Sequence, residues 1–272
     1  MQLTDAEIRQ ILIREKRRKR RRQQMRRRRT VLVILLLIIA VIVAVRYAGS
    51  KETPPAAEPS RGVVFIDPGH GGEDPGSDNG ARYEKDDTLK LALAVRDQLE
   101  KANFTVVMSR TEDVAVERAA RGQMANENGA KLMVSIHRNK ADGAGQGVEA
   151  FIPVANTPES QLLAGNIVRS LAAQGFTERT VRAGTLQSEL ENYEELAVAT
   201  MPCCIVEVGF LDNVDDNALF DNNLEANAKA ICEAIDQAFI SLYEPEKLQT
   251  EEEAQTEEAP AEAPAEEAPA EG

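Results

Sequence analysis

Three short, largely apolar runs organise the middle of the chain, and each leads to an imidazole or a carboxylate. They have the length and β-branched content of buried strands: Val63–Ile66, Leu132–Ile136 and Cys204–Phe210. His70 follows the first run on a glycine-rich loop, His137 closes the second, and Glu207 lies within the third. Ligands of an open α/β sheet bind outside the carboxyl ends of its strands. The pattern therefore predicts that the chain's only two histidines and Glu207 meet at one edge of a sheet.

Segments with helical periodicity separate these runs, and two further strands lie among them. We expect helices over Thr88–Lys101, from Asp113 to Asn128, over Pro158–Gln174 and from Leu224 to Leu242, and strands over Phe104–Met108 and Val148–Ile152. Residues 176–200 show no clear period, and Glu189–Ala199 is read as a short helix or a lid over the site. Strands that alternate with helices predict an α/β fold, with one domain over residues 62–243 and a mostly parallel twisted sheet flanked by helices.

The N-terminal region has the pattern of a membrane anchor. Val31–Val45 contains fifteen consecutive residues without a polar side chain, and only Thr30 separates it from four arginines. With its flanking residues this segment is long enough to span a bilayer, because Arg29 and Arg46 can snorkel. We expect a basic cytoplasmic arm over residues 1–30 and a single transmembrane helix over 31–48, with the rest extracytoplasmic. A cleaved signal peptide is the alternative, but no clear small-x-small cleavage site follows.

Charge is distributed unevenly along the chain, whose formal net charge is −13. Residues 1–30 carry +10 and residues 244–272 carry −10, so residues 31–243 account for the whole net charge. An acidic domain argues against nucleic acid as a partner. Residues 49–61 read as a Pro- and Ala-containing linker, and the Glu/Ala/Pro repeats of 244–272 as a disordered tail. The three cysteines have no C-x-x-C spacing, so buried thiols are expected rather than a disulfide.

The residue types at the three strand ends suit a hydrolytic zinc site, which uses three protein ligands and keeps one position open. His70 and His137 offer two nitrogens. The third ligand remains open among the acids near the first strand: Glu73, Asp74, Asp78, Glu84, Asp86 and Asp87. Glu207 would stay off the metal, take a proton from the attacking water and pass it to the leaving amine. Structural histidines are the alternative, and their shared position at strand ends argues against it.

Other groups near these strands have simpler interpretations. The loop Gly69–Gly72 lacks the Lys and Ser/Thr spacing of a nucleotide-binding loop. Glu149 alternates with apolar neighbours and is expected on a solvated strand face. Arg110 and Arg118 are expected to form ion pairs near the sheet. Glu207 is harder to explain structurally, because an unpaired carboxylate in an apolar strand is costly to bury.

Eight segments agree in order and spacing with one enzyme family over most of residues 62–243. They are Ile66–Gly76, Glu84-Lys85, Ser109–Asp113, Arg118, Ala125-Asn126, Val134–His137, Gly147–Glu149 and Pro202–Asn213. Across them the chain resembles the zinc-dependent N-acetylmuramoyl-L-alanine amidases of bacterial cell walls, which include membrane-anchored spore-cortex amidases. The resemblance implies that His70, Glu84 and His137 bind Zn²⁺ and that Glu207 is the catalytic carboxylate. It also implies hydrolysis of the amide between N-acetylmuramic acid and the L-alanine of the peptidoglycan stem peptide.

The chain departs from the family pattern at a few positions outside the implied metal site. Arg138 and Lys140 follow His137 where small or neutral residues are commoner, and Ala197 stands where an arginine is frequent. The expected partners are peptidoglycan and, through the N-terminal helix, the cytoplasmic membrane; the sequence identifies no regulatory protein. Two other functions remain open, a catalytically silent wall-binding or regulatory domain and a zinc peptidase that acts on the stem peptide.

Overall fold

The computed structural model describes residues 25, 60–155 and 157–247. The predicted cytoplasmic arm (except Met25), the transmembrane segment, most of the linker and most of the acidic tail lie outside these residues. Within the described part of the chain, no helix combines the length and apolar character needed to cross a bilayer. The chain divides into two compact units, residues 1–58 and 59–272, and the fold below belongs to the second.

Six strands form one mixed sheet in the order β2-β1-β3-β6-β4-β5. Their bounds are β1 Val63–Pro68, β2 Thr105–Met108, β3 Leu132–Asn139, β4 Val148–Ile152, β5 Glu178–Ala183 and β6 Cys203–Phe210. Strands β2, β1, β3 and β6 are mutually parallel, whereas β4 runs antiparallel to β6 and β5 runs parallel to β4. A short loop without a helix joins β3 to β4, and such a connection reverses the chain direction. The predicted single α/β domain is confirmed.

Six helices flank the sheet, and their bounds differ in places from the predictions. They are α2 Glu84–Lys101, α3 Arg118–Glu127, α4 Pro158–Ala172, α5 Glu194–Val198, α6 Val214–Asn222 and α7 Leu224–Tyr243. The prediction that a helix begins at Asp113 is wrong: α3 begins at Arg118, and the Asp113 carboxylate accepts hydrogen bonds from Gly72 N and Lys85 Nζ. Helix α6 and strand β5 were not expected. Asn213 caps α6 by accepting hydrogen bonds from two backbone N–H groups.

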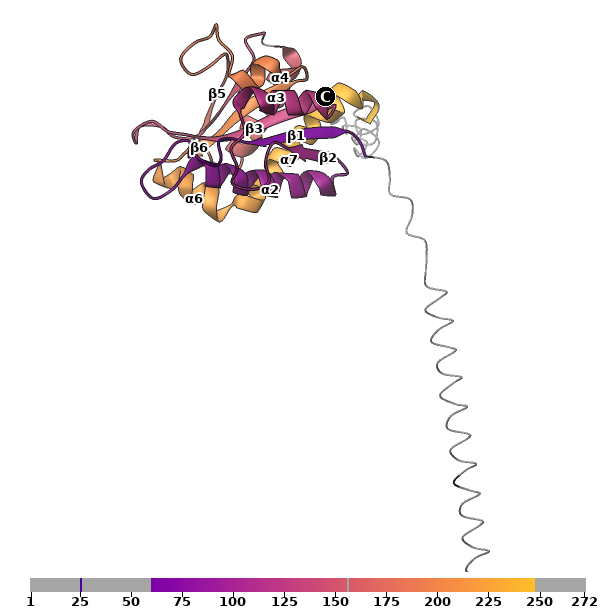
Figure 1. The fold of residues 1–272 in the computed structure, drawn as a ribbon, viewed down its shortest axis with the longest axis horizontal. Coiled ribbons are helices and arrows are strands. Elements are labelled where there is room, and N and C mark those ends of the chain that lie inside the picture. The colour runs from indigo at the N-terminus through magenta and orange to yellow at the C-terminus, as the bar shows by residue number, and fades with distance from the viewer. Residues whose placement is uncertain (1–24, 26–59, 156, 248–272) are drawn as a thin grey trace, which may run out of the picture. The chain divides into compact units, whose positions relative to one another are not determined.

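Successive side chains along each strand point to opposite faces of the sheet, so they pack into two separate cores, one on each face. The larger core packs β-strand residues against α2, α4 and α7. The smaller core lies beneath α3 and α5 and includes Phe65, Met133, Phe151 and Ile205. Helices α2 and α3 lie on opposite sides of β1 in Figure 1. All three cysteines are buried free thiols, as expected.

The carboxyl end of β1 contains a buried ion pair on the face covered by α3. Asp67 is fully buried, and Arg121 of α3 donates from Nη1 to its Oδ1 at 2.7 Å. Ser135 of β3 donates to the other carboxylate oxygen at 2.6 Å. Arg121 also donates to the carbonyls of Pro68 and His70. The ion pair therefore ties β1, β3, α3 and the loop that carries His70 into one unit.

A second buried arginine holds the same loop through backbone groups. Arg110 donates to the carbonyls of Pro68, Gly69 and Lys85. The expectation that Arg110 forms an ion pair is wrong, since no carboxylate lies within salt-bridge distance of it among the described residues. Its guanidinium donates hydrogen bonds to carbonyl oxygens that have no backbone partner where the chain turns after β1.

Asp67→Asn tests the buried ion pair. The substitution keeps the shape of the side chain but leaves the Arg121 charge buried without a counter-charge. We expect it to lower the free energy of unfolding by about 3–5 kcal/mol, measured by chemical denaturation. Glu233→Gln is the control, because Glu233 pairs with Lys229 at the surface, where both side chains are more than half exposed, and stability should not change. Equal stability of the two variants would contradict this role of Asp67.

Candidate metal centre

His70 lies on the loop that leaves β1, in a backbone conformation that is uncommon for a residue with a side chain. Its φ is +59°, in the left-handed region. The conformation persists because Arg121 binds the carbonyl of His70 and Gly69 N donates to the carbonyl of Ile136 in β3. A strained residue that the surrounding structure fixes so firmly is a common sign of a functional site.

His137 and Glu84 come from two other elements and converge on His70. His137 lies near the carboxyl end of β3, and Glu84 is the first residue of α2. Glu84 Oε1 lies 2.9 Å from His137 Nδ1 and 3.2 Å from His70 Nε2. The two imidazole rings stand edge to face, with centroids 4.9 Å apart. The structure thus brings together the two predicted histidines and one of the six acids left open by the sequence.

These three residues fit the donor set of a hydrolytic zinc site. One ligand atom from each lies within 4.8 Å of the others. Two ligands about 2.0–2.1 Å from a tetrahedral zinc ion would be about 3.3–3.4 Å apart, close to the separations around Glu84 Oε1. Asp74 accepts a hydrogen bond from the other ring nitrogen of His70, Nδ1, at 2.8 Å. A carboxylate on the far nitrogen of a histidine is the usual support of a metal ligand.

Two glycines leave room for the ligand side chains. A Cβ on Gly69 would lie 2.3 Å from Cε1 of His137. A Cβ on Gly76 would lie 2.6 Å from His70 and 2.7 Å from Glu84, and its φ of +65° also favours glycine. The glycine-rich loop therefore serves to accommodate the cluster, not to cradle a phosphate.

The cluster carries strongly shifted pKa values. Burial raises the pKa of Glu84, but hydrogen bonds to His137 and His70 outweigh burial, and the net shift is downward. Burial lowers the pKa of His137, but the hydrogen bond and charge of Glu84 raise it, and the result is about 9. In the absence of a metal, Glu84 is therefore ionised and holds a proton on His137. A metal ion would take the place of this proton, since ligating histidine is neutral.

Glu207 lies beside His137 on the neighbouring strand β6, at the same level of the sheet. Its Oε2 is buried and has no hydrogen-bond partner among the described residues. Burial raises the pKa of Glu207 to about 8, although the charge of His137 opposes the shift. Glu207 is not one of the three converging ligands. It is therefore a carboxylate with near-neutral proton affinity next to the cluster, as a general base requires.

A cavity of about 230 Å³ opens in front of the cluster and of Glu207. Arg118, Tyr193 and Glu195 are among the residues that form its other walls. Arg118 was expected in an ion pair, but none is formed with the described residues and its side chain is exposed. Glu195 is buried, yet its Oε2 also lacks a hydrogen-bond partner.

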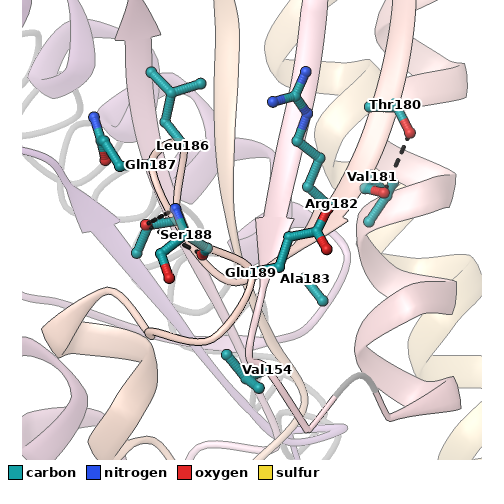
Figure 2. Close-up of a pocket in the computed structure, with 10 residues that line it drawn as sticks. Val154, Thr180, Val181, Arg182, Ala183, Leu186, Gln187, Ser188 and Glu189 are labelled. Atoms are coloured by element: carbon teal, nitrogen blue, oxygen red, sulfur yellow. Dashed lines mark hydrogen bonds between the residues drawn. The ribbon is translucent and has the colours of Figure 1, made fainter.

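A larger hollow of about 730 Å³ lies along the edge strand β5, where Arg182, Ser188 and Glu189 line it (Figure 2). Leu186 lines both this hollow and the cavity in front of the metal cluster, so the turn that contains Leu186 lies between the two. Tyr193 Oη accepts a hydrogen bond from Leu186 N, and Asn192 Oδ1 accepts one from Val154 N. The segment expected to be a short helix or a lid thus contains helix α5, and its preceding loop forms a wall of the cavity.

Several residues singled out in the sequence take other positions. Asp87 pairs with Arg138 at 2.6 Å, and Arg138 also lies over the ring of Phe220. Because residues alternate along β3, the side chain of Arg138 lies on the face opposite His137, where it is buried. Glu149 was expected to be solvated, but it is buried and accepts hydrogen bonds from Asn139 and Arg179.

Comparison with known proteins agrees with this site. A profile of the family described as N-acetylmuramoyl-L-alanine amidase matches residues 64–237. The sporulation-specific N-acetylmuramoyl-L-alanine amidase of Bacillus subtilis (strain 168) is 34% identical over 181 residues, 65% of this chain and 68% of that protein. The amidase CwlM of Bacillus licheniformis is 36% identical over 156 residues, 56% of this chain and 58% of CwlM.

Solved structures show the same similarity. An N-acetylmuramoyl-L-alanine amidase from Clostridium difficile 630 has a TM-score of 0.56 at 30% identity, covering 66% of this chain and 95% of that one. The catalytic domain of CwlV from Bacillus (Paenibacillus) polymyxa var. colistinus also has a TM-score of 0.56 at 30% identity, covering 66% and 97%. Since the family profile covers more than half of the chain and spans all four site residues, the chain belongs to the N-acetylmuramoyl-L-alanine amidase family.

Proposed function

We propose that this protein is a zinc-dependent amidase that hydrolyses the bond between N-acetylmuramic acid and the L-alanine of the stem peptide. The observation that carries the proposal is a His-Glu-His cluster with an unpartnered carboxylate beside it and a cavity in front. Family membership supplies the bond that is cleaved. In this proposal peptidoglycan is the substrate.

His70, Glu84 and His137 would hold the zinc ion. Two imidazole nitrogens and one carboxylate oxygen make up a set of three ligands, which would leave a fourth position for water or substrate. Bound zinc would polarise the scissile carbonyl and lower the pKa of the attacking water. The protein's own contribution is to hold the ligands: the Asp74 carboxylate orients His70, and Ser77 N donates to Glu84 Oε2 at 2.8 Å.

Glu207 would move the proton that the reaction requires. Water adds to the carbonyl carbon of the lactyl group, and the bond from that carbon to the L-alanine nitrogen breaks. The proton lost by water passes through the Glu207 carboxylate to that nitrogen, which leaves as an amine. No described residue forms a hydrogen bond with Glu207 Oε2. This supports the role, because a carboxylate that accepts hydrogen bonds from other groups would be a weaker base.

We propose that the domain acts outside the cytoplasmic membrane. Support comes from the sequence alone: residues 31–48 have the apolar pattern of a single-pass anchor, preceded by a basic arm. Peptidoglycan lies on that side of the membrane, so the proposed substrate and the predicted orientation agree. The anchor stays a prediction, because its residues lie outside the described structure.

The products of the reaction distinguish this proposal from the other functions. Purified protein incubated with intact muropeptides should release free glycan and new L-alanine amino termini, identified by mass spectrometry. A chelator should abolish this release, and added zinc should restore it. Release of D-alanine would instead identify a stem-peptide peptidase, and binding without any product would identify a wall-binding domain.

Glu207→Gln separates the proton-transfer role from metal binding. The amide keeps the size of the side chain but cannot accept the proton, so turnover should fall by about 10²- to 10⁴-fold. Zinc content, measured by elemental analysis, should stay the same as in the unmodified protein. Loss of zinc from the Glu207→Gln variant would show that Glu207 is a ligand, which contradicts the proposed role.

Gly69→Ala tests whether the loop glycine accommodates the metal ligands. The added methyl group would displace the ring of His137, so the zinc dissociation constant should rise at least about tenfold, measured by competition with a chelating dye. Gly165→Ala in helix α4 is the matched control, because its methyl would meet only the flexible end of Arg169. Unchanged zinc affinity in Gly69→Ala would mean that the loop yields without disturbing the site.

A further inference from the structure

We infer that Glu195 is a substrate-binding carboxylate that accepts hydrogen bonds from N–H groups on the peptide side of the scissile amide. The inference rests on the proposed function, because it assigns part of the substrate to one wall of the same cavity. It concerns a residue that the sequence did not single out. Neither the metal cluster nor the proposed proton transfer uses it.

The surroundings of Glu195 are those of a binding group and not of a surface acid. Its residue exposure is 3%, and it lines the cavity together with the cluster and Glu207. Neither of its carboxylate oxygens accepts a hydrogen bond from a described residue, and Oε2 is out of reach of solvent. Its charge acts on both His137 and Tyr193. Glu195 therefore presents an unpartnered carboxylate next to the proposed reaction centre.

Another buried acid, Asp216, differs from Glu195 in the support that its carboxylate receives. Asp216 also has one buried oxygen without a partner, but its other oxygen accepts hydrogen bonds from the backbone N–H groups of Gly147 and Phe210. Glu195 has no such support. An unsatisfied buried carboxylate costs the fold free energy. The other oxygen of Glu195, Oε1, is not among the solvent-inaccessible atoms, so a ligand in the cavity can donate to Oε1 and stabilise the carboxylate.

The position of Glu195 is fixed through its backbone. Helix α5 approaches α3 so closely at Gly122 that a Cβ there would lie 2.3 Å from the carbonyl oxygen of Glu195. The side chain of Asn126 holds the end of α5, since it donates to the carbonyl of Val198 and accepts from Thr200 N. Leu196 is buried in the core beneath the helix. The carboxylate is therefore placed by rigid contacts, although nothing holds it by hydrogen bonds.

The chemistry of the substrate indicates what Glu195 would bind. On the glycan side, the scissile bond presents a carbonyl oxygen, which suits the metal. On the peptide side, the scissile amide and the peptide bonds that follow it present N–H groups. A carboxylate is a good acceptor of hydrogen bonds from such groups. Glu84 would hold the metal and Glu207 would engage the attacking water, so Glu195 is the cavity carboxylate left to accept hydrogen bonds from the peptide. Arg118, a cation without an ion-pair partner among the described residues, also lines the cavity, but it is exposed and leaves Glu195 unpaired.

The test uses the Glu207→Gln background, in which an intact muropeptide can bind without being cleaved. The zinc-loaded protein is titrated with the muropeptide by calorimetry, with and without Glu195→Gln. Loss of charge-assisted hydrogen bonds should raise the dissociation constant about 10- to 100-fold. Glu194→Gln is the matched control, because Glu194 precedes Glu195 on the same helix but is exposed and does not line the cavity. It should leave the dissociation constant unchanged.

Two further measurements separate binding from a structural role. Glu195→Gln should not lower the Tm, because it removes an unpartnered buried charge, and it should not change the zinc content. In the otherwise unmodified enzyme it should raise KM more than it lowers kcat. A fall in Tm or in zinc content, or a dissociation constant equal to that of the control, would overturn the inference. Failure of the Glu207→Gln protein itself to bind any muropeptide would instead refute the proposed function.

Discussion

The buried ion pair between Asp67 and Arg121 is the constraint on which the site depends. It lies at the point where β1 ends, and the same arginine binds the carbonyls of Pro68 and His70. The ion pair thereby positions one of the groups that hold His70 at a positive φ. Arg110 adds further bonds to the same carbonyl-rich turn. His70 is therefore positioned by the buried Asp67–Arg121 ion pair as well as by the glycine-rich sequence of its loop.

The other two ligands are linked by a second network on the opposite face of the sheet. Asp87 lies one turn after Glu84 on α2, and Arg138 directly follows His137 on β3. The ion pair between Asp87 and Arg138 joins the start of the helix to the end of the strand. Arg138 N also donates to Glu84 Oε1. The three ligands are thus held together before any metal binds, so binding requires little rearrangement.

The sequence predicted the elements that have strong periodicity and missed those that depend on tertiary contacts. Strand ends located both histidines and Glu207, but spacing alone could not choose Glu84, because that choice depends on where α2 begins. Helix α6 buries only Asp216 and Phe220 and has no apolar stripe to reveal it. Glu149 looked solvated because its partners Asn139 and Arg179 are distant in sequence. Strict alternation along β3 could have placed Arg138 away from His137.

The short connection after β3 has a consequence for how this enzyme can diversify. Because β4 and β5 run opposite to the other strands, the segment that leaves β5 is free to fold back along the cavity through Leu186 and Tyr193. None of the proposed metal ligands lies on that segment. Insertions or substitutions between β5 and β6 could therefore alter which wall fragments are accepted while the hydrolytic machinery stays intact, so new specificities can evolve without loss of chemistry.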